Sequence, residues 1–395
     1  ALRKKGLRIT DAGRADIAIV NTCAFIDDAK RESIDAILGL IDLKKAGTIK
    51  KIIVQGCLAQ RYKDELRRQF PEVDCFVGAS GLTPGTVRFA LTPAHLAYLK
   101  ICEGCVNFCS FCIIPKIKGR LSSLPVADVA RKAAAFNRQG IAELDVIGHD
   151  ITGYGLDLYG KPRLTECLKV ILKKTPRIGW VRLLYLHPCR VDDRLLELVR
   201  DHPRVCKYID LPVQHISARI LKHMRRSPGP KELRALIAKV RKLVPEAAIR
   251  TSVIVGFPGE TEKEFRQLCD FIRAERFERL GAFIYSREEG TPAYALAGQV
   301  PPAVQQQRLN RIMSLQQAVS TENNRKLLGR SLRVLIEERH HGRYLARSEF
   351  DAPEVDGQVF VHSRKRHRPG DFVTVRIVDT LEYDLEKRPS NEHRQ

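Results

Sequence analysis

The chain has 395 residues, a hydrophobic share of 44% and a formal net charge of +22. This length allows two or three domains with their own cores, and the absence of a long apolar run excludes a helical membrane protein. Because the first residues lack the apolar stretch of a signal peptide, the 11 cysteines predict a reducing, cytoplasmic setting. The charge indicates either a solvated basic surface or contact with a polyanion such as RNA.

A first domain is predicted over residues 1–90, where short β-branched runs are each followed by a cysteine and a helical pattern. The runs are Ile17–Val20 and Lys51–Val54, and one helical pattern extends from Lys30 to Leu43. This alternation predicts a parallel sheet flanked by helices. Cys23 and Cys57 would then lie just past the carboxyl ends of strands, at the edge where open α/β sheets bind ligands.

A second domain is predicted over residues 91–325, where six candidate strands alternate with helical patterns. Six units predict a partial β/α barrel, with its chemistry at the carboxyl ends of the strands. The candidate strands are Tyr98–Ile101, Glu143–Ile147, Val181–Tyr185, Tyr208–Leu211, Arg250–Val255 and Ala282–Tyr285.

A long helix is predicted from Pro302 to Leu328, because proline is favoured at the first position of a helix. The third domain, residues 326–390, has short β segments separated by Gly and Pro turns, which predict a small β-barrel. We expect the polar tail after Leu385 to be disordered. The β segments are Arg333–Ile336, Gln358–Val361 and Phe372–Ile377.

Three cysteines with the spacing C-x-x-x-C-x-x-C follow the first barrel strand: Cys105, Cys109 and Cys112. Three thiolates in one loop can bind three irons of a [4Fe–4S] cluster and leave the fourth iron open. A structural zinc site would need a fourth Cys or His nearby, and a disulfide framework would need an even count. The spacing therefore predicts a redox-active iron–sulfur site, with the nearby Cys102 as a packing residue.

This spacing, with the aromatic Phe111 before the last cysteine, resembles the radical S-adenosylmethionine (SAM) superfamily. The resemblance implies that the open iron chelates the amino and carboxylate groups of SAM. One electron then cleaves a C–S bond and gives a 5′-deoxyadenosyl radical. The cofactor carries the difficult chemistry, and the protein positions it and shields the radical.

The three segments together resemble the methylthiotransferase family over nearly the whole chain. This resemblance implies an α/β protein with a flavodoxin-like N-terminal domain, a central partial (βα)6 radical SAM barrel and a C-terminal TRAM β-barrel. It also implies a second, auxiliary [4Fe–4S] cluster, whose ligands here are Cys23 and Cys57. The first cysteine of the family falls before this sequence begins, so the sequence is interpreted as truncated. Cys75 is an alternative ligand, but a small buried thiol is the preferred interpretation.

The family chemistry is the insertion of a methylthio group into an unactivated C–H bond, with the auxiliary cluster as sulfur carrier. The resemblance implies that Phe111 and residues at the strand ends line the SAM pocket. The family usually has Gln at the position of His149. The predicted SAM-pocket residues are Phe111, His149, Asp150, Gln214 and Gly256.

Family members divide into tRNA-modifying enzymes and a branch that modifies an aspartate of small-subunit ribosomal protein S-twelve. The tRNA branch tends to have Arg-Pro-Gly-Thr after the last barrel strand, where this chain has Glu288 and Glu289 before Gly290 and Thr291. Two carboxylates would repel a tRNA backbone and attract a Lys/Arg-rich protein loop. Three further stretches also resemble the ribosomal-protein branch: Asn21–Asp27, Arg347–Gly357 and Thr380–Leu385.

We therefore expect an enzyme that adds a methylthio group to the β-carbon of that aspartate. The alternatives are a tRNA adenosine methylthiotransferase, favoured by overall charge, and an inactive ribosome- or RNA-binding remnant. An electron donor such as flavodoxin or ferredoxin, a monomer and no membrane association are also expected. The positive charge is concentrated between Arg219 and Arg250, which predicts a surface for ribosomal RNA. That surface includes Lys222, Arg225, Arg226, Lys231, Arg234, Lys239, Arg241 and Lys242.

Overall fold

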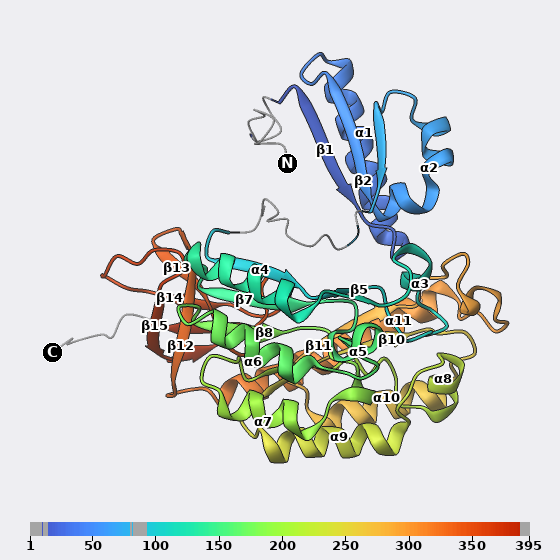
Figure 1. Cartoon of the computed structure of the whole chain (residues 1–395). Helices are drawn as coiled ribbons and strands as arrows, with labels where there is room; N and C mark the ends of the chain where they lie inside the picture. The colour runs from blue at the N-terminus through green and yellow to red at the C-terminus, as the bar shows by residue number, and fades with distance from the viewer. Residues whose placement is uncertain (1–9, 11–14, 80, 82–92, 388–395) are drawn as a thin grey trace. The chain divides into compact units, whose positions relative to one another are not determined.

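A computed structural model describes the chain except for residues 1–9, 11–14, 80, 82–92 and 388–395 (Figure 1). The chain forms two compact units. The smaller one comprises residues 1–81, 110–119 and 286–295, and the larger one comprises residues 82–109, 120–285 and 296–395. The domain limits predicted from the sequence, 1–90, 91–325 and 326–390, stay predictions. None of the helices in the described part of the chain has the length and apolarity of a bilayer span.

The smaller unit contains a parallel sheet in the order β1-β2-β3, with α1 and α2 packed against it (Figure 1). Alternate residues of β2, Ile52 and Val54, are buried in the same core as Ile37 and Ile41 of α1. The predicted strands and helix are thus confirmed, although α1 begins earlier than expected. The elements are β1 (Ile17–Thr22), α1 (Asp27–Lys45), β2 (Lys51–Gly56), α2 (Cys57–Gln69) and β3 (Cys75–Gly78), followed by α3 (Ile114–Ile117).

The prediction of a buried thiol at Cys75 was wrong. Cys75 is the first residue of β3 and is exposed, whereas the next residue, Phe76, is buried in the core. Successive side chains of a strand point to opposite faces, so only one of these two neighbours can face the core.

The larger unit contains the six predicted parallel strands, which form two sheets of three in the orders β4-β7-β8 and β11-β10-β9. The isolated bridge between Val181 and Val205 and a hydrogen bond from Leu186 N to Asp210 O connect β8 with β9. The predicted partial barrel is therefore confirmed. Its strands are β4 (Leu96–Lys100), β7 (Glu143–Ile147), β8 (Trp180–Leu183), β9 (Tyr208–Asp210), β10 (Ala248–Val255) and β11 (Arg279–Ile284).

Helices with one apolar face separate these strands and cover the barrel (Figure 1). In α10, Thr261 and Glu264 form a reciprocal capping box that fixes the start of the helix. The predicted long helix is α11, which ends at Arg325, three residues before the predicted end. The remaining elements are β5 (Cys102–Glu103), β6 (Ser122–Ser123), α4 (Val126–Arg138), α5 (Leu156–Tyr159), α6 (Leu164–Lys174), α7 (Asp193–Asp201), α8 (Ala218–His223), α9 (Pro230–Leu243), α10 (Glu262–Glu275) and α11 (Pro302–Arg325).

The end of the chain forms a six-stranded sheet in the order β15-β12-β13-β14-β17-β16, which confirms the small β-barrel. Most of its pairs are antiparallel, and a bulge interrupts β12 between Ile336 and Glu338. The predicted disordered tail is corrected in part, because Leu385 starts β17; its residues 388–395 lie outside the described ones. The strands are β12 (Ser331–His340), β13 (Arg343–Ser348), β14 (Val359–Val361), β15 (Phe372–Arg376), β16 (Asp379–Thr380) and β17 (Leu385–Lys387).

Buried ion pairs join this sheet to the amino ends of the barrel strands. Glu143 at the start of β7 binds Arg182 of β8 at 2.8 Å and also Arg347 of β13. Burial opposes ionisation of Glu143, but the two guanidinium groups outweigh it and hold its pKa at about 2. Next to this pair, burial and the Glu143 charge raise the pKa of Asp145 well above its usual range.

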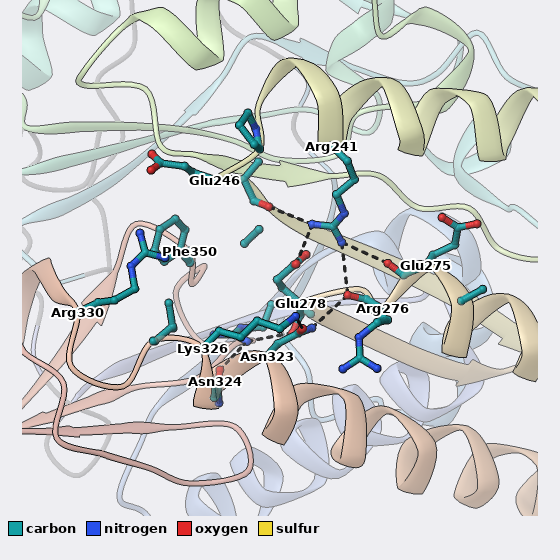
Figure 2. Close-up of a pocket in the computed structure, with 16 residues that line it drawn as sticks. Arg241, Glu246, Glu275, Arg276, Glu278, Asn323, Asn324, Lys326, Arg330 and Phe350 are labelled. Carbon is teal, nitrogen blue, oxygen red and sulfur yellow. Dashed lines mark hydrogen bonds and ion pairs between the residues drawn. The ribbon is translucent and has the colours of Figure 1, made fainter.

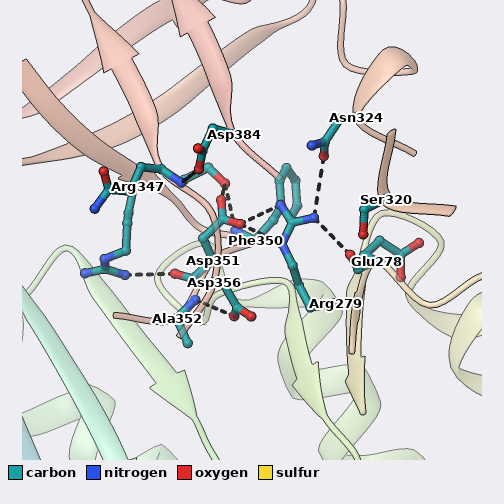
Figure 3. A network of polar contacts seen from close by, with 12 residues as sticks. Glu278, Arg279, Ser320, Asn324, Arg347, Phe350, Asp351, Ala352, Asp356 and Asp384 are labelled. Carbon is teal, nitrogen blue, oxygen red and sulfur yellow. Dashed lines mark hydrogen bonds and ion pairs between the residues drawn. The ribbon is translucent and has the colours of Figure 1, made fainter. Parts of the chain in front are cut away.

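The acidic stretch 347–357, which resembles the ribosomal-protein branch, supplies two of these contacts (Figure 3). Asp351 accepts a 2.8 Å hydrogen bond from Nε of Arg279, at the start of β11. Asp356 accepts a 2.6 Å bond from the Tyr208 hydroxyl and lies 3.4 Å from Nε of Arg250. These carboxylates therefore fix the C-terminal sheet to the barrel.

Asp351→Asn keeps the size of the side chain but leaves the buried Arg279 guanidinium without its counter-charge. Removing one partner of a buried ion pair costs about 3–5 kcal/mol, and we expect this loss in the free energy of unfolding of the larger unit. Urea denaturation measures it. Glu354→Gln, in the same loop but exposed, should change the free energy by less than about 0.5 kcal/mol. Equal losses in both variants would contradict the assignment.

Candidate functional site

The loop after β5 carries the cysteine motif, and its first two cysteines belong to the larger unit. Cys105 Sγ accepts hydrogen bonds from the backbone N and from Nδ2 of Asn107, both at 3.3 Å. Burial raises the pKa of the Cys105 thiol, and the Asn107 donors act in the opposite direction. Cys109 is buried, and Nη1 of Arg226 lies 3.6 Å from its Sγ. Both sulfur atoms thus already face hydrogen-bond donors.

Asp150 supports the first cysteine through Asn107. Its carboxylate accepts from the backbone N and hydroxyl of Thr152, at 3.0 and 2.5 Å, and from Asn107 Nδ2 at 2.7 Å. Arg190 binds both Asp150 and the side-chain oxygen of Asn107. Burial disfavours the charged Asp150, but Arg190 and Thr152 outweigh it and lower its pKa. The Asp150 carboxylate is therefore held by protein groups.

The other SAM-pocket residues predicted in the larger unit also follow barrel strands. Half-buried His149 precedes Asp150 after β7, and Gln214 lies beyond β9 with a left-handed backbone (φ 69°) that pairs with β10. Gly256 follows β10 with φ +72°, and a Cβ there would lie 2.4 Å from Gln305 Cγ. The backbone angle and this contact both favour glycine here. These residues therefore share the carboxyl edge of the sheet, as expected for a β/α barrel.

Two groups outside the five predicted SAM-pocket residues lie beside them. The Glu260 carboxylate accepts from the backbone N of Gly256 and lies 3.5 Å from His215 Nε2 and 3.3 Å from Arg308. Burial and the neighbouring Arg226 charge lower the pKa of His187 to about 3, so its ring is neutral. Arg226 itself was expected on a basic surface for RNA, but it is half-buried against Cys109.

In the smaller unit, each predicted auxiliary ligand directly follows a strand, and the two strands are paired up to their last residues. Thr22 of β1 pairs with Gly56 of β2, and Cys23 and Cys57 come directly after this pair. Gly56 has φ +112°, and a Cβ would lie 2.4 Å from Thr22 O, so the close approach requires glycine. Cys23 is exposed, and its backbone exchanges two hydrogen bonds with Ser33 Oγ.

The segments 110–119 and 286–295 also belong to the smaller unit. The first contains Phe111 and Cys112, both half-buried. In the second, Glu288 is 1% exposed and forms ion pairs with Arg61 at 2.6 Å and Lys30 at 3.1 Å. Glu289 is exposed, and only its carbonyl is held, by a 2.8 Å bond from Arg61. The charge of Glu288 is therefore neutralised inside the unit, whereas that of Glu289 faces solvent.

A cavity of about 500 Å³ opens at the other end of the larger unit (Figure 2). It is lined by Ala248 and Arg279, which start β10 and β11, and by the ends of α10 and α11. Arg241 spans it, with bonds to Glu278 at 2.7 Å and to main-chain carbonyls (Figure 2). None of the predicted cluster ligands or SAM-pocket residues lines this cavity, so it is separate from the cysteine loop.

Comparisons with known proteins agree on one family. The chain matches the models for the radical SAM superfamily over residues 99–272, the TRAM domain over 328–388 and the uncharacterized protein family UPF0004 over 1–78. A ribosomal protein uS12 methylthiotransferase RimO from Anaeromyxobacter sp. (strain K) is 43% identical, over 97% of this chain and 87% of its own. The chain belongs to the RimO family of radical SAM methylthiotransferases.

A second RimO relative, from Clostridioides difficile (strain 630), is 42% identical over 97% of this chain and 93% of its own. Among solved structures, the radical SAM methyltransferase TsrM from Kitasatospora setae superposes with a TM-score of 0.53 at 14% identity. That match covers 70% of this chain and 66% of TsrM, and it supports the fold. As a RimO family member, the chain is an enzyme that uses [4Fe–4S] clusters and SAM.

The residues beside the cysteine loop fit a [4Fe–4S] cluster bound through thiolates, because they offer buried hydrogen-bond donors. The Nε atoms of Arg190 and Arg226 are buried and have no acceptor within the described residues. Buried donors are normally satisfied, so these two indicate a partner that the protein itself does not supply. No three His, Cys, Asp or Glu side chains in the described part of the chain gather around one metal position. A [4Fe–4S] cluster does not require this, because each thiolate binds a different iron.

Arg61→Met should destabilise the smaller unit, because Glu288 would stay buried with Lys30 as its only counter-charge. Hydrogen bonds to charged groups contribute about 1.5–3 kcal/mol, and we expect a loss of this size. Thermal unfolding followed by circular dichroism measures it. Lys45→Met breaks a pair with Glu72 that is exposed on both sides, and should cost less than about 1 kcal/mol. A stable Arg61→Met variant would show that Lys30 alone is sufficient to balance the charge of Glu288.

Proposed function

We propose that this chain adds a methylthio group to the β-carbon of an aspartate of ribosomal protein uS12. The observation that carries the proposal is the match to uS12 methylthiotransferases over 97% of the chain at 43% identity. The two alternatives from the sequence, a tRNA adenosine methylthiotransferase and an inactive RNA-binding remnant, are outcomes of the test below. A cytoplasmic monomer that receives electrons from flavodoxin or ferredoxin completes the proposal.

Cys105, Cys109 and Cys112 are the proposed ligands of the radical SAM cluster. When bound, the cluster and SAM supply a radical that removes a hydrogen atom from the substrate carbon. The protein's own part is positional. Asn107 donates to the Cys105 sulfur, and Asp150 and Arg190 hold Asn107 in place. Hydrogen bonds from outside the ligand set orient ligands in this way.

For the SAM pocket, we propose different roles for the residues at the strand ends. Asp150 acts through Asn107 and Arg190, because its oxygens are already engaged. Gly256 lets the backbone turn closely at the end of β10, and Gln214 offers a half-buried side chain. His149 and Phe111 are also proposed to line the pocket.

Cys23 and Cys57 are the proposed ligands of the auxiliary cluster. What supports the proposal is the register of β1 and β2, in which Thr22 and Gly56, the residues just before the two cysteines, are paired. The exposure of Cys23 leaves this edge accessible for a cluster that carries sulfur.

Contact with the ribosomal subunit is proposed for the basic residues of α8 and α9 that have no acidic partner in the described structure. Arg234, Lys239 and Arg241 are paired with Glu275, Asp193 and Glu278. Exposed cations without such partners are free to bind phosphate groups. The proposed contact residues are Lys222, Lys231 and Lys242.

The function is tested by anaerobic incubation of reconstituted enzyme with SAM, dithionite, uS12 and bulk tRNA, followed by mass spectrometry of both macromolecules. We expect a methylthio-sized mass gain on one aspartate of uS12, and its loss in Cys109→Ser. Cys189→Ser, which changes an exposed thiol outside the motif, should keep the activity. A gain on tRNA adenosine would favour the first alternative. No deoxyadenosine and no product would favour the inactive remnant.

Glu289→Gln should raise KM for uS12 by about two- to fivefold and leave kcat unchanged, because exposed charges at a binding edge mainly affect association. Steady-state kinetics at low and moderate salt measures the effect, which should shrink as salt increases. Glu338→Gln is a matched control, since it also removes an exposed carboxylate, but from the C-terminal sheet. An unchanged KM would show that Glu289 does not contact the substrate.

A further inference from the structure

Arg226 places a guanidinium group directly on the sulfur of a proposed cluster ligand. Its Nη1 lies 3.6 Å from Cys109 Sγ, and its Nη2 donates to the carbonyl of Pro212, just past β9. The backbone N of Arg226 donates to Leu221 O at 2.9 Å, which ties it to α8. The backbone of Arg226 is thus tied to α8, and its guanidinium is held by the Pro212 carbonyl and directed at the thiol.

The charge of Arg226 is not balanced by the protein. No carboxylate in the described part of the chain pairs with it, whereas the nearby Arg190 binds Asp150. Its half-buried position weakens screening by solvent, so the charge acts more strongly on its neighbours. Its Nε is also buried without an acceptor among the described groups.

A fixed cation next to a cluster favours the state that holds one more electron. Hydrogen bonds to the sulfurs and local charge are two of the main means by which a protein sets the potential of an iron–sulfur cluster. We propose that Arg226 is a positioning residue that raises the reduction potential of the cluster bound by Cys109, so that a biological one-electron donor can reduce it. The balanced step is the uptake of one electron by the oxidised [4Fe–4S]2+ cluster to give [4Fe–4S]+.

The inference is tested by a redox titration of reconstituted full-length enzyme, without substrate, with dithionite as reductant and the reduced cluster followed by EPR. In Arg226→Gln, the ratio of reduced to oxidised cluster at a fixed potential should fall about tenfold, which corresponds to a shift of about 59 mV for one electron. Arg226→Lys keeps the charge and should stay within about threefold of the wild type.

Arg225→Gln is the matched control. Arg225 is the preceding residue, carries the same charge, is exposed and has no side-chain hydrogen bond or ion pair among the described residues. Its potential should equal that of the wild type. Equal shifts of the reduction potential in Arg225→Gln and Arg226→Gln would show an effect of general surface charge and overturn the inference. An unchanged potential in Arg226→Gln would also overturn it. Loss of bound iron in Arg226→Gln would assign Arg226 a structural role instead.

The inference depends on the proposed ligation by Cys109, and the same experiment separates the two. A wild-type enzyme without a reducible cluster would overturn the ligand assignment itself. A reducible wild-type cluster whose potential ignores Arg226 would overturn the present inference alone.

Discussion

The carboxylate of Glu143, held between Arg182 and Arg347, is the contact on which the arrangement of the larger unit depends. It joins two neighbouring barrel strands and the C-terminal sheet in one buried group. An unpaired buried charge is far less stable than a paired one, so each partner holds the others in place. Because the amino ends of the strands are filled by these pairs, the carboxyl ends are left for the cysteine loop and its neighbours.

At the carboxyl ends of the barrel strands, the side chains near the cysteines are hydrogen-bond donors rather than acceptors. Asn107 and Arg226 direct N–H groups at Cys105 and Cys109, and Arg190 adds a second guanidinium. At Cys105 the Asn107 donors favour the thiolate, the form of cysteine that binds metal, but burial has the larger effect and raises the pKa of this thiol. Burial and the Arg226 charge keep the ring of His187 neutral although a carboxylate lies nearby. The fold therefore prepares a site for anions before any cofactor arrives.

The sequence was sufficient where the signal was local. The alternation of strand and helix patterns predicted all six barrel strands, and the spacing of Cys105, Cys109 and Cys112 predicted an iron–sulfur site that the family match supports. It failed where the contact partner is remote. Arg226 is 117 residues from Cys109, and Arg61 is 227 residues from Glu288, so neither pairing has a sequence pattern. Cys75 was misjudged because an apolar run does not reveal which face of a strand is outward.

The segment 286–295 follows the last barrel strand in the sequence but folds with the smaller unit, where Glu288 is buried against Lys30 and Arg61. A protein shortened to begin after residue 90 would therefore lose more than a separate module. It would retain Glu288 and Cys112 in segments stripped of the partners that order them. The two units are interleaved along the polypeptide. Replacing the smaller unit by that of another protein would therefore require changes in residues 110–119 and 286–295 as well as in the N-terminal segment.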